Sequence, residues 1–127
     1  SGGFKVQGKS LQAAQELLDS ARAVEEAGAF MVVLEGIPKM LADVITQKIS
    51  IPTMGIGAGA GCDMQVLVAQ DMLGMNEWVP KFAKKFADLH TIIIDAYNEF
   101  AKESNERTFP NEATQYNAKI EGIENLK

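Results

Sequence analysis

The stretch Phe30-Met31-Val32-Val33-Leu34-Glu35-Gly36-Ile37-Pro38 decides the fold predicted for this chain of 127 residues. Its first five residues are apolar and include two valines, which is typical of a strand buried on both faces. Glu35 ends the strand, and the chain then turns into a helix that Pro38 begins. Proteins of the α/β class place their chemistry at the C-terminal ends of such strands, so Glu35 is a candidate general base. The alternative is a polar strand end that helps to cap the following helix, and position alone does not decide between the two.

The segments around this strand predict regular alternation of helices and strands. Apolar spacing and turn residues indicate, in order, a helix at 10–27, the strand at 30–35, a helix at 38–48, a strand at 51–56, a glycine loop at 57–61, a strand at 65–68 and a helix at 81–104. Such alternation predicts a parallel sheet with right-handed crossovers. A (β/α)₈ TIM barrel uses about 30 residues for each of its units, so about three strands and their helices make part of one. We therefore expect an α/β fold in which residues 1–104 are the C-terminal portion of a TIM-barrel domain and residues 105–127 are an extended tail.

Composition narrows the class of protein. The chain is 46% hydrophobic and 23% charged, which is ordinary for a globular protein. A formal net charge of -5 and dispersed lysines argue against a nucleic-acid partner. No apolar stretch approaches the roughly 20 residues of a membrane span, so no membrane association is expected. The single cysteine, Cys62, excludes an internal disulfide and favours a cytoplasmic protein. The start at Ser1, without methionine, suggests a processed or trimmed product.

The glycine loop 57–61 does not fit a nucleotide-binding motif. A dinucleotide fingerprint needs G-x-G-x-x-G at the start of a helix, but its third glycine falls on Ala60 or Cys62. Residues 65–68, which follow, are typical of a strand. A loop of this composition at a strand end suits a close approach of the backbone to a ligand, so Gly57 and Gly59 are candidate residues of a substrate pocket. The alternative is tight-turn geometry with no ligand.

Five further residues could carry chemistry, and each has a plainer interpretation that we favour. Asp63 and Asp71 lack the convergent carboxylates of an oxygen-ligand metal site, so structural capping is expected. Cys62 has no C-x-x-C partner and is expected to pack as a small apolar residue. His90 lacks an H-E-x-x-H neighbour and is expected to be a surface or hydrogen-bonded histidine. Trp78 lies in an apolar loop that is expected to cover a core or meet a partner chain.

Several short segments, taken in order, resemble one enzyme family. They are Gly2–Gly8, Val33–Pro38, Ile51–Gly59, Gly61–Asp63, Gln65–Val68, Asp71–Gly74 and Pro80–Phe86. With compatible spacing up to about Pro110, they closely resemble the C-terminal half of ketopantoate hydroxymethyltransferases. This family is a (β/α)₈ barrel.

The resemblance implies a function in pantothenate and coenzyme A biosynthesis. A hydroxymethyl group would pass from 5,10-methylenetetrahydrofolate to 3-methyl-2-oxobutanoate, giving 2-dehydropantoate. Glu35 matches the family's glutamate that accepts a proton. The family's Mg²⁺ ligands lie on earlier strands, so the resemblance implies that no metal ligand lies in this chain. It also implies a homo-oligomer and a partner in the N-terminal half of the barrel, without which the chain is expected to be inactive.

Two other functions stay open from the sequence. One is another Mg²⁺-dependent lyase or mutase of the same barrel type that acts on a 2-oxo acid. Folate-dependent transfer, as opposed to carbon–carbon cleavage, would separate it from the transferase. The second is a non-catalytic fragment that needs its N-terminal half, which native mass spectrometry would detect as a pair of chains.

Overall fold

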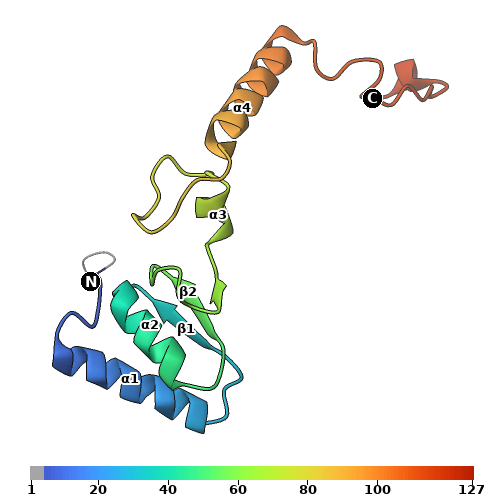
Figure 1. Cartoon of the computed structure of the whole chain (residues 1–127). Coiled ribbons are helices and arrows are strands. Elements are labelled where there is room, and N and C mark those ends of the chain that lie inside the picture. Colours follow the sequence, from blue (N-terminus) through green and yellow to red (C-terminus); the bar gives the residue numbers. More distant parts are fainter. Residues whose placement is uncertain (1–4) are drawn as a thin grey trace. The chain divides into compact units, whose positions relative to one another are not determined.

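The computed structural model describes residues 5–127, which fall into two compact units that divide after Asp88 (Figure 1). The first unit contains a small parallel sheet and the helices α1 to α3. The second unit, Leu89–Lys127, contains α4 and the C-terminal segment.

The sheet is parallel, as the sequence predicts. Its strands are β1 (Val32–Glu35), β2 (Thr53–Ile56) and β3 (Met64–Gln65), in the order β1-β2-β3. Glu35 at the end of β1 pairs with Ile56 at the end of β2. The carboxyl ends of both strands therefore lie at the same edge of the sheet. Residues that are far apart in the sequence come close together at this edge.

Two helices form a layer against one face of the sheet. They are α1 (Leu11–Glu26) and α2 (Lys39–Lys48), close to the predicted bounds. The hydroxyl of Ser10 accepts a hydrogen bond from the N–H of Ala13 at 3.1 Å, which caps the first helix as predicted. Residues of the helices, the first two strands and the loops between them form a common core: Leu18, Ala21, Leu34, Ile37, Leu41, Ala42, Ile45, Ile49, Ala58 and Cys62.

The prediction that the first strand is buried on both faces is wrong for the chain that the structure describes. Leu34 points into the core and is buried, whereas Val33 is 54% exposed. Successive side chains of a strand point to opposite faces, so Val33 and Glu35 share the face opposite the helices. Residues 5–127 provide a helical layer for one face, and on β1 the other face stays open.

The third strand is shorter than predicted. It contains two residues, Met64–Gln65, instead of the four expected at 65–68. The N–H of Val66 still donates to the carbonyl of Gly55 at 3.0 Å, but the pairing stops there. The chain then enters the short helix α3 (Ala69–Met72), which begins after Val68.

The long helix also begins later than predicted. Its bounds are Leu89–Glu106, so residues 81–88 form turns instead of the first two helical turns. The N–H of Phe86 donates to the carbonyl of Met72 at 2.7 Å, a tertiary bond that helical geometry would not provide. Gly74 lies so close to the carbonyl of Ala87 that a side chain there would overlap it. Packing against the end of α3 therefore overrides the helical periodicity of this segment.

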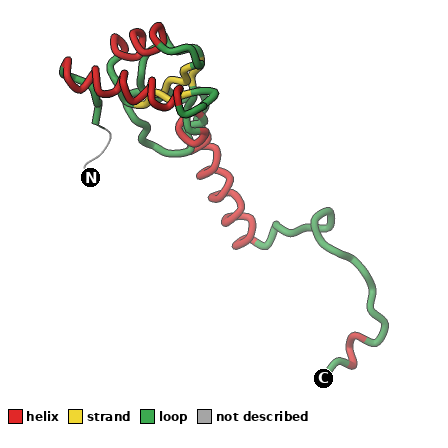
Figure 2. The backbone as a smooth tube through the Cα atoms, turned by 90° about the horizontal axis from the view of Figure 1, so that it is seen from below, coloured by secondary structure: helices red, strands yellow, loops and turns green. Residues whose placement is uncertain are grey.

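The second unit contains α4 and an irregular segment with a short 3₁₀ helix, Ile123–Asn125 (Figure 2). The rings of Phe100 and Phe109 meet edge to face, with centroids 5.7 Å apart, so the first residues after α4 pack against its C-terminal end. The units divide at residue 88, and the expected division into a barrel portion and a tail at residue 104 stays a prediction.

Candidate functional site

Glu35 lies at the C-terminal end of β1 with an exposed side chain. Immediately after it, the N–H of Gly36 donates to the carbonyl of Ile56 at 2.9 Å, which ties the strand end to β2. Gly36 has a φ of 61°, in the left-handed region that favours glycine, so the chain turns sharply there. This turn carries the backbone away and keeps the Glu35 carboxylate at the open face.

The alternative role for Glu35, as a cap of the next helix, is not found. Pro38 is the N-cap residue of α2, and in the described structure no side chain makes a capping hydrogen bond there. The carboxylate of Glu35 is therefore available to other groups at the strand end.

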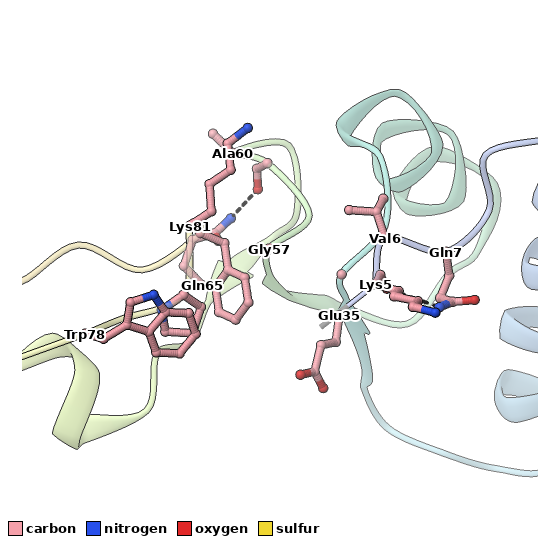
Figure 3. A pocket seen from close by; sticks show the side chains of 13 residues that line it. Lys5, Val6, Gln7, Glu35, Gly57, Ala60, Gln65, Trp78 and Lys81 are labelled. Atoms are coloured by element: carbon pink, nitrogen blue, oxygen red, sulfur yellow. Dashed lines mark hydrogen bonds between the residues drawn. The ribbon is translucent and has the colours of Figure 1, made fainter. Parts of the chain in front are cut away.

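A cavity of about 1440 Å³ opens at this edge of the sheet (Figure 3). Glu35, Gly57 and Gly59, the three site residues predicted from the sequence, all line it. The other described lining residues come from an N-terminal segment, the turn after β1, the glycine loop, β3 and the segment before α4: Lys5, Val6, Gln7, Gly36, Ala60, Gln65, Trp78, Pro80, Lys81 and Phe82. The structure thus brings the candidate base and the glycine loop to one cavity.

The N-terminal segment forms the wall beside the candidate base. The N–H of Gln7 donates to the carbonyl of Gly36 at 2.9 Å. The side-chain amide of Gln7 also donates to the carbonyl of Lys5 at 3.1 Å. The first bond holds residues 5–7 against the end of β1, next to Glu35, and the second lies within the segment.

The glycine loop is packed too closely for side chains. A Cβ at Gly57, whose φ is 61°, would meet atoms of the Phe82 side chain at 3.0–3.3 Å. A Cβ at Gly59, whose φ is 78°, would meet Cγ and Cβ of Lys39 at 2.6 and 2.8 Å. Backbone conformation therefore favours glycine at both positions, and space favours it most strongly at Gly59. The loop is both a tight turn and part of the cavity wall, and the approach of a ligand to Gly57 and Gly59 stays a prediction.

One hydrogen bond and close packing against α2 hold the same loop in place. The side-chain amide of Gln65 donates to the carbonyl of Gly59 at 2.9 Å, from β3. On the α2 side, the ammonium of Lys39 pairs with the carboxylate of Asp43 at 2.5 Å, and Gly61 lies against the other oxygen of Asp43. The loop is therefore held between β3 and the first turns of α2.

Asp63 and Cys62 have the structural roles predicted for them. One carboxylate oxygen of Asp63 accepts from the backbone N–H of Thr53 at 2.8 Å, which caps the start of β2. The Cys62 thiol is free and buried in the core, 2.8 Å from where a Cβ of Gly55 would lie. Asp71 lies in α3, and His90 is half-buried at the start of α4.

The described residues do not fit a metal centre of their own. Between Lys5 and Lys127, no group of three or more histidine, cysteine, aspartate or glutamate side chains is placed to hold a metal ion. Glu35 is the single acidic residue among the described residues that line the cavity, and Mg²⁺ prefers several oxygen ligands. No helix within the described range is long and apolar enough to cross a membrane.

Sequence reasoning missed most of the second cavity wall. The sequence predicts Trp78 only as part of an apolar loop, and Gln65, Lys81 and Phe82 belong to segments that resemble the family but are not predicted to line a pocket. Their place depends on where residues 77–88 pack, and the sequence predicts a helix for most of that segment. Lys5 and Gln7 were missed because a backbone hydrogen bond, which has no side-chain signature, brings them to the strand end.

Comparison with known proteins gives consistent results. The family model described as ketopantoate hydroxymethyltransferase matches residues 1–112. The 3-methyl-2-oxobutanoate hydroxymethyltransferase of Clostridium novyi is 57% identical over 110 residues, which are 86% of this chain and 40% of that protein. The enzyme of the same name from Enterococcus faecalis is 56% identical over 110 residues, again 86% of this chain and 40% of that protein. The one from Carboxydothermus hydrogenoformans is 48% identical over 126 residues, 98% of this chain and 46% of that protein.

The chain thus spans less than half the length of the curated relatives it matches. The family match nevertheless includes both strands that border the cavity, the glycine loop and the segment up to α4. The chain belongs to the ketopantoate hydroxymethyltransferase family.

Proposed function

We propose that the protein containing this chain transfers a hydroxymethyl group from 5,10-methylenetetrahydrofolate to 3-methyl-2-oxobutanoate, giving 2-dehydropantoate for pantothenate and coenzyme A biosynthesis. The observation that carries the proposal is the position of Glu35. It lies at the carboxyl end of a parallel strand, on the face opposite the helices, and lines a cavity with Gly57 and Gly59. The relatives are 3-methyl-2-oxobutanoate hydroxymethyltransferases, which is the same reaction class.

Glu35 is proposed to accept the proton from C3 of the keto acid. When the C3–H bond breaks, the proton goes to the Glu35 carboxylate and the electron pair stays as an enolate. The enolate carbon then forms a bond to the one-carbon unit, whose bonds to the folate nitrogens break. Water supplies the hydroxyl oxygen. A carboxylate positioned within reach of the C3 proton contributes typically 10²–10⁴-fold to the rate of such a step.

The sheet is proposed to be part of a (β/α)₈ barrel. On β1, Leu34 faces the helices and Glu35 faces away from them, as residues do on the two sides of a barrel strand. Further strands beside β1 and β3 would close the sheet, and Val33, now exposed, would then face the barrel interior.

The proposals that the protein binds Mg²⁺ and forms a homo-oligomer rest on the family resemblance. A magnesium ion would have to be held mainly by residues outside this chain, because the described residues lack a ligand group. When bound, the ion would act as a Lewis acid on the keto oxygen and stabilise the enolate that forms when Glu35 accepts the proton. A homo-oligomer in the cytoplasm is likewise a proposal.

Proton exchange at C3 tests the role of Glu35 directly. In D₂O, the complete protein is expected to exchange the C3 proton of 3-methyl-2-oxobutanoate, followed as loss of the C3 signal by ¹H NMR without folate. Glu35→Gln should lower this exchange and kcat about 10²–10⁴-fold, because an amide does not accept the proton.

Glu26→Gln is the matched control, since Glu26 is an exposed carboxylate on α1 that does not line the cavity. It should exchange at the rate of the unmodified protein. Exchange by Glu35→Gln within a factor of three of that rate would remove Glu35 from the reaction.

A further inference from the structure

Thr53 and Asp63 form a hydrogen-bonded pair at the amino-terminal edge of the sheet, away from the strand ends that border the cavity. Thr53 begins β2 and is completely buried, and Asp63 is the residue before β3. One carboxylate oxygen of Asp63 accepts hydrogen bonds from the backbone N–H of Thr53 at 2.8 Å and from its hydroxyl at 3.3 Å. The N–H of Asp63 donates back to the Thr53 hydroxyl oxygen at 3.1 Å. The starts of two neighbouring strands are thus joined in both directions.

The Thr53 hydroxyl also contacts α2, where it lies 2.9 Å from the hydroxyl of Thr46. A hydroxyl has one proton and two lone pairs. Because the Thr53 proton goes to Asp63, the Thr46 hydroxyl is the donor of this bond, and all three hydrogen-bonding positions of the Thr53 hydroxyl are used. Loss of this hydroxyl would leave the N–H of Asp63 and the hydroxyl of Thr46 without their acceptor.

The Thr53–Asp63 pair sets the register of β3. This strand has two residues, and neither is buried in the described structure, so apolar burial does not fix how it pairs with β2. With Asp63 bonded to Thr53, Gln65 lies opposite Gly55. A shift of one residue would turn the Gln65 side chain to the other face of the sheet.

Gln65 connects this register to the cavity. Its side-chain nitrogen lies 3.4 Å from where a Cβ of Gly55 would be, so the side chain passes close over Gly55. It then donates to the carbonyl of Gly59 at 2.9 Å (Figure 3). Gln65 and Gly59 both line the cavity, whereas Thr53 and Asp63 do not. The pair at one edge of the sheet therefore determines whether the glycine loop is held at the other edge.

We infer that Thr53 and Asp63 are positioning residues for the substrate cavity, which hold β3 in the register that lets Gln65 fix the glycine loop. The inference rests on the proposed function, in which that loop borders the keto acid.

The candidate base is held independently of this pair. β1 has its own ladder with β2, and the N–H of Gly36 donates to the carbonyl of Ile56 at 2.9 Å. Loss of the Thr53–Asp63 pair should therefore weaken binding of the keto acid more than it slows proton transfer to Glu35.

Kinetics of C3 proton exchange by the complete protein test this inference, at a temperature where circular dichroism shows every variant to be folded. Thr53→Val keeps the side-chain volume and removes the hydroxyl. It should raise the KM for 3-methyl-2-oxobutanoate about tenfold, because misplacement of a binding group by about 1 Å is costly even far from the chemistry. Its kcat should stay within about threefold of the unmodified protein, which is the signature of lost binding alone. Asp63→Ala should give the same split.

Conservative variants should restore the KM. Thr53→Ser keeps the hydroxyl, and Asp63→Asn keeps an oxygen that can accept from the N–H of Thr53. Both should have a KM within about threefold of the unmodified protein. In a Gln65→Ala background, Asp63→Ala should raise the KM by less than about twofold, because the two residues act on the loop in series.

Glu25→Ala is the matched control for a loss of stability alone. The Glu25 carboxylate also accepts backbone N–H groups near the start of β2, those of Ser50 and Ile51, but it ties them to α1 and not to β3. This variant should lower the free energy of unfolding and leave KM and kcat unchanged.

Three results would overturn the positioning role while leaving the role of Glu35 intact. They are an unchanged KM in Thr53→Val and Asp63→Ala, an equal rise of the KM in Glu25→Ala, and a full tenfold rise on adding Asp63→Ala to Gln65→Ala. If the unmodified protein did not exchange the C3 proton, the proposed function and this inference would fall together.

Discussion

The glycine loop allows a quantitative test, because Gly59 and Gly28 share one constraint and differ in another. Both have a positive φ, 78° and 93° respectively. A Cβ at Gly59 would meet Lys39 at 2.6 and 2.8 Å, whereas a Cβ at Gly28 would meet nothing within 4 Å among the described residues. Alanine at Gly28 therefore introduces backbone strain alone, and alanine at Gly59 introduces strain and overlap.

The expected losses of stability follow from these two terms. A left-handed backbone costs an alanine about 1–2 kcal/mol, which is the expected loss for Gly28→Ala. Overlap in a packed region adds about 1–3 kcal/mol, so Gly59→Ala should lose about 2–5 kcal/mol in total. The difference between the two variants measures how tightly the loop lies against α2.

Guanidinium unfolding of the complete protein, with linear extrapolation to water, gives both free energies. Gly59→Ala should recover part of its loss in a Lys39→Ala background, because that change removes the Cγ atom at 2.6 Å. Equal losses for Gly28→Ala and Gly59→Ala, with no coupling to Lys39, would show that the loop is not packed on α2 as described.

Three further outcomes are expected. In guanidinium unfolding, Glu25→Ala should lower the unfolding free energy by about 1–3 kcal/mol. The Glu25 carboxylate accepts hydrogen bonds from the backbone N–H groups of residues 50–51 at 2.6 and 3.1 Å, and the substitution leaves these groups without that partner. Glu26→Ala, at a neighbouring exposed position, should change the unfolding free energy by less than about 0.5 kcal/mol. Gly57→Val should raise the KM for the keto acid in steady-state assays, because a branched side chain at a φ of 61° would displace Phe82, and an unchanged KM would mean that the loop does not border the substrate. The 127-residue chain on its own should show neither folate-dependent transfer nor micromolar Mg²⁺ binding by calorimetry, since its described residues provide no metal-ligand group, and either activity would contradict this.

The sequence by itself determined the elements that local rules govern. Ser10 and Gly28 mark the ends of α1, and the structure has the cap at Ser10 and a left-handed glycine at 28. The apolar run before Glu35 specifies a strand. The glycine loop specifies a turn, because a stretch so rich in glycine forms neither a helix nor a strand. Capping, periodicity and glycine content act over a few residues, so they can be read without knowing the fold.

Only the tertiary structure decided where the helix after β3 and α3 begins. The apolar stripe of residues 81–104 predicts one long helix, yet α4 begins at Leu89 because the N–H of Phe86 bonds to Met72 and Gly74 packs on Ala87. This displacement of residues 81–88 from a helix also places Lys81 and Phe82 on the cavity wall. The pattern of apolar residues within 81–104 carries no information about these contacts with α3, because they depend on how the whole unit packs.

The candidate site is divided in the same way. The sequence determined that a carboxylate ends a strand and that glycines end the next one, because strand and turn chemistry are local. It did not determine that residues 5–7 lie beside Glu35 or that Trp78 lies across the cavity, since those positions depend on a backbone hydrogen bond to Gly36 and on the packing of Phe82 against Gly57. The burial of β1 also depended on tertiary structure. Its apolar residues predict that both faces of the strand are covered. The packing of α1 and α2 covers only the face that carries Leu34, so Glu35 stays open to the cavity.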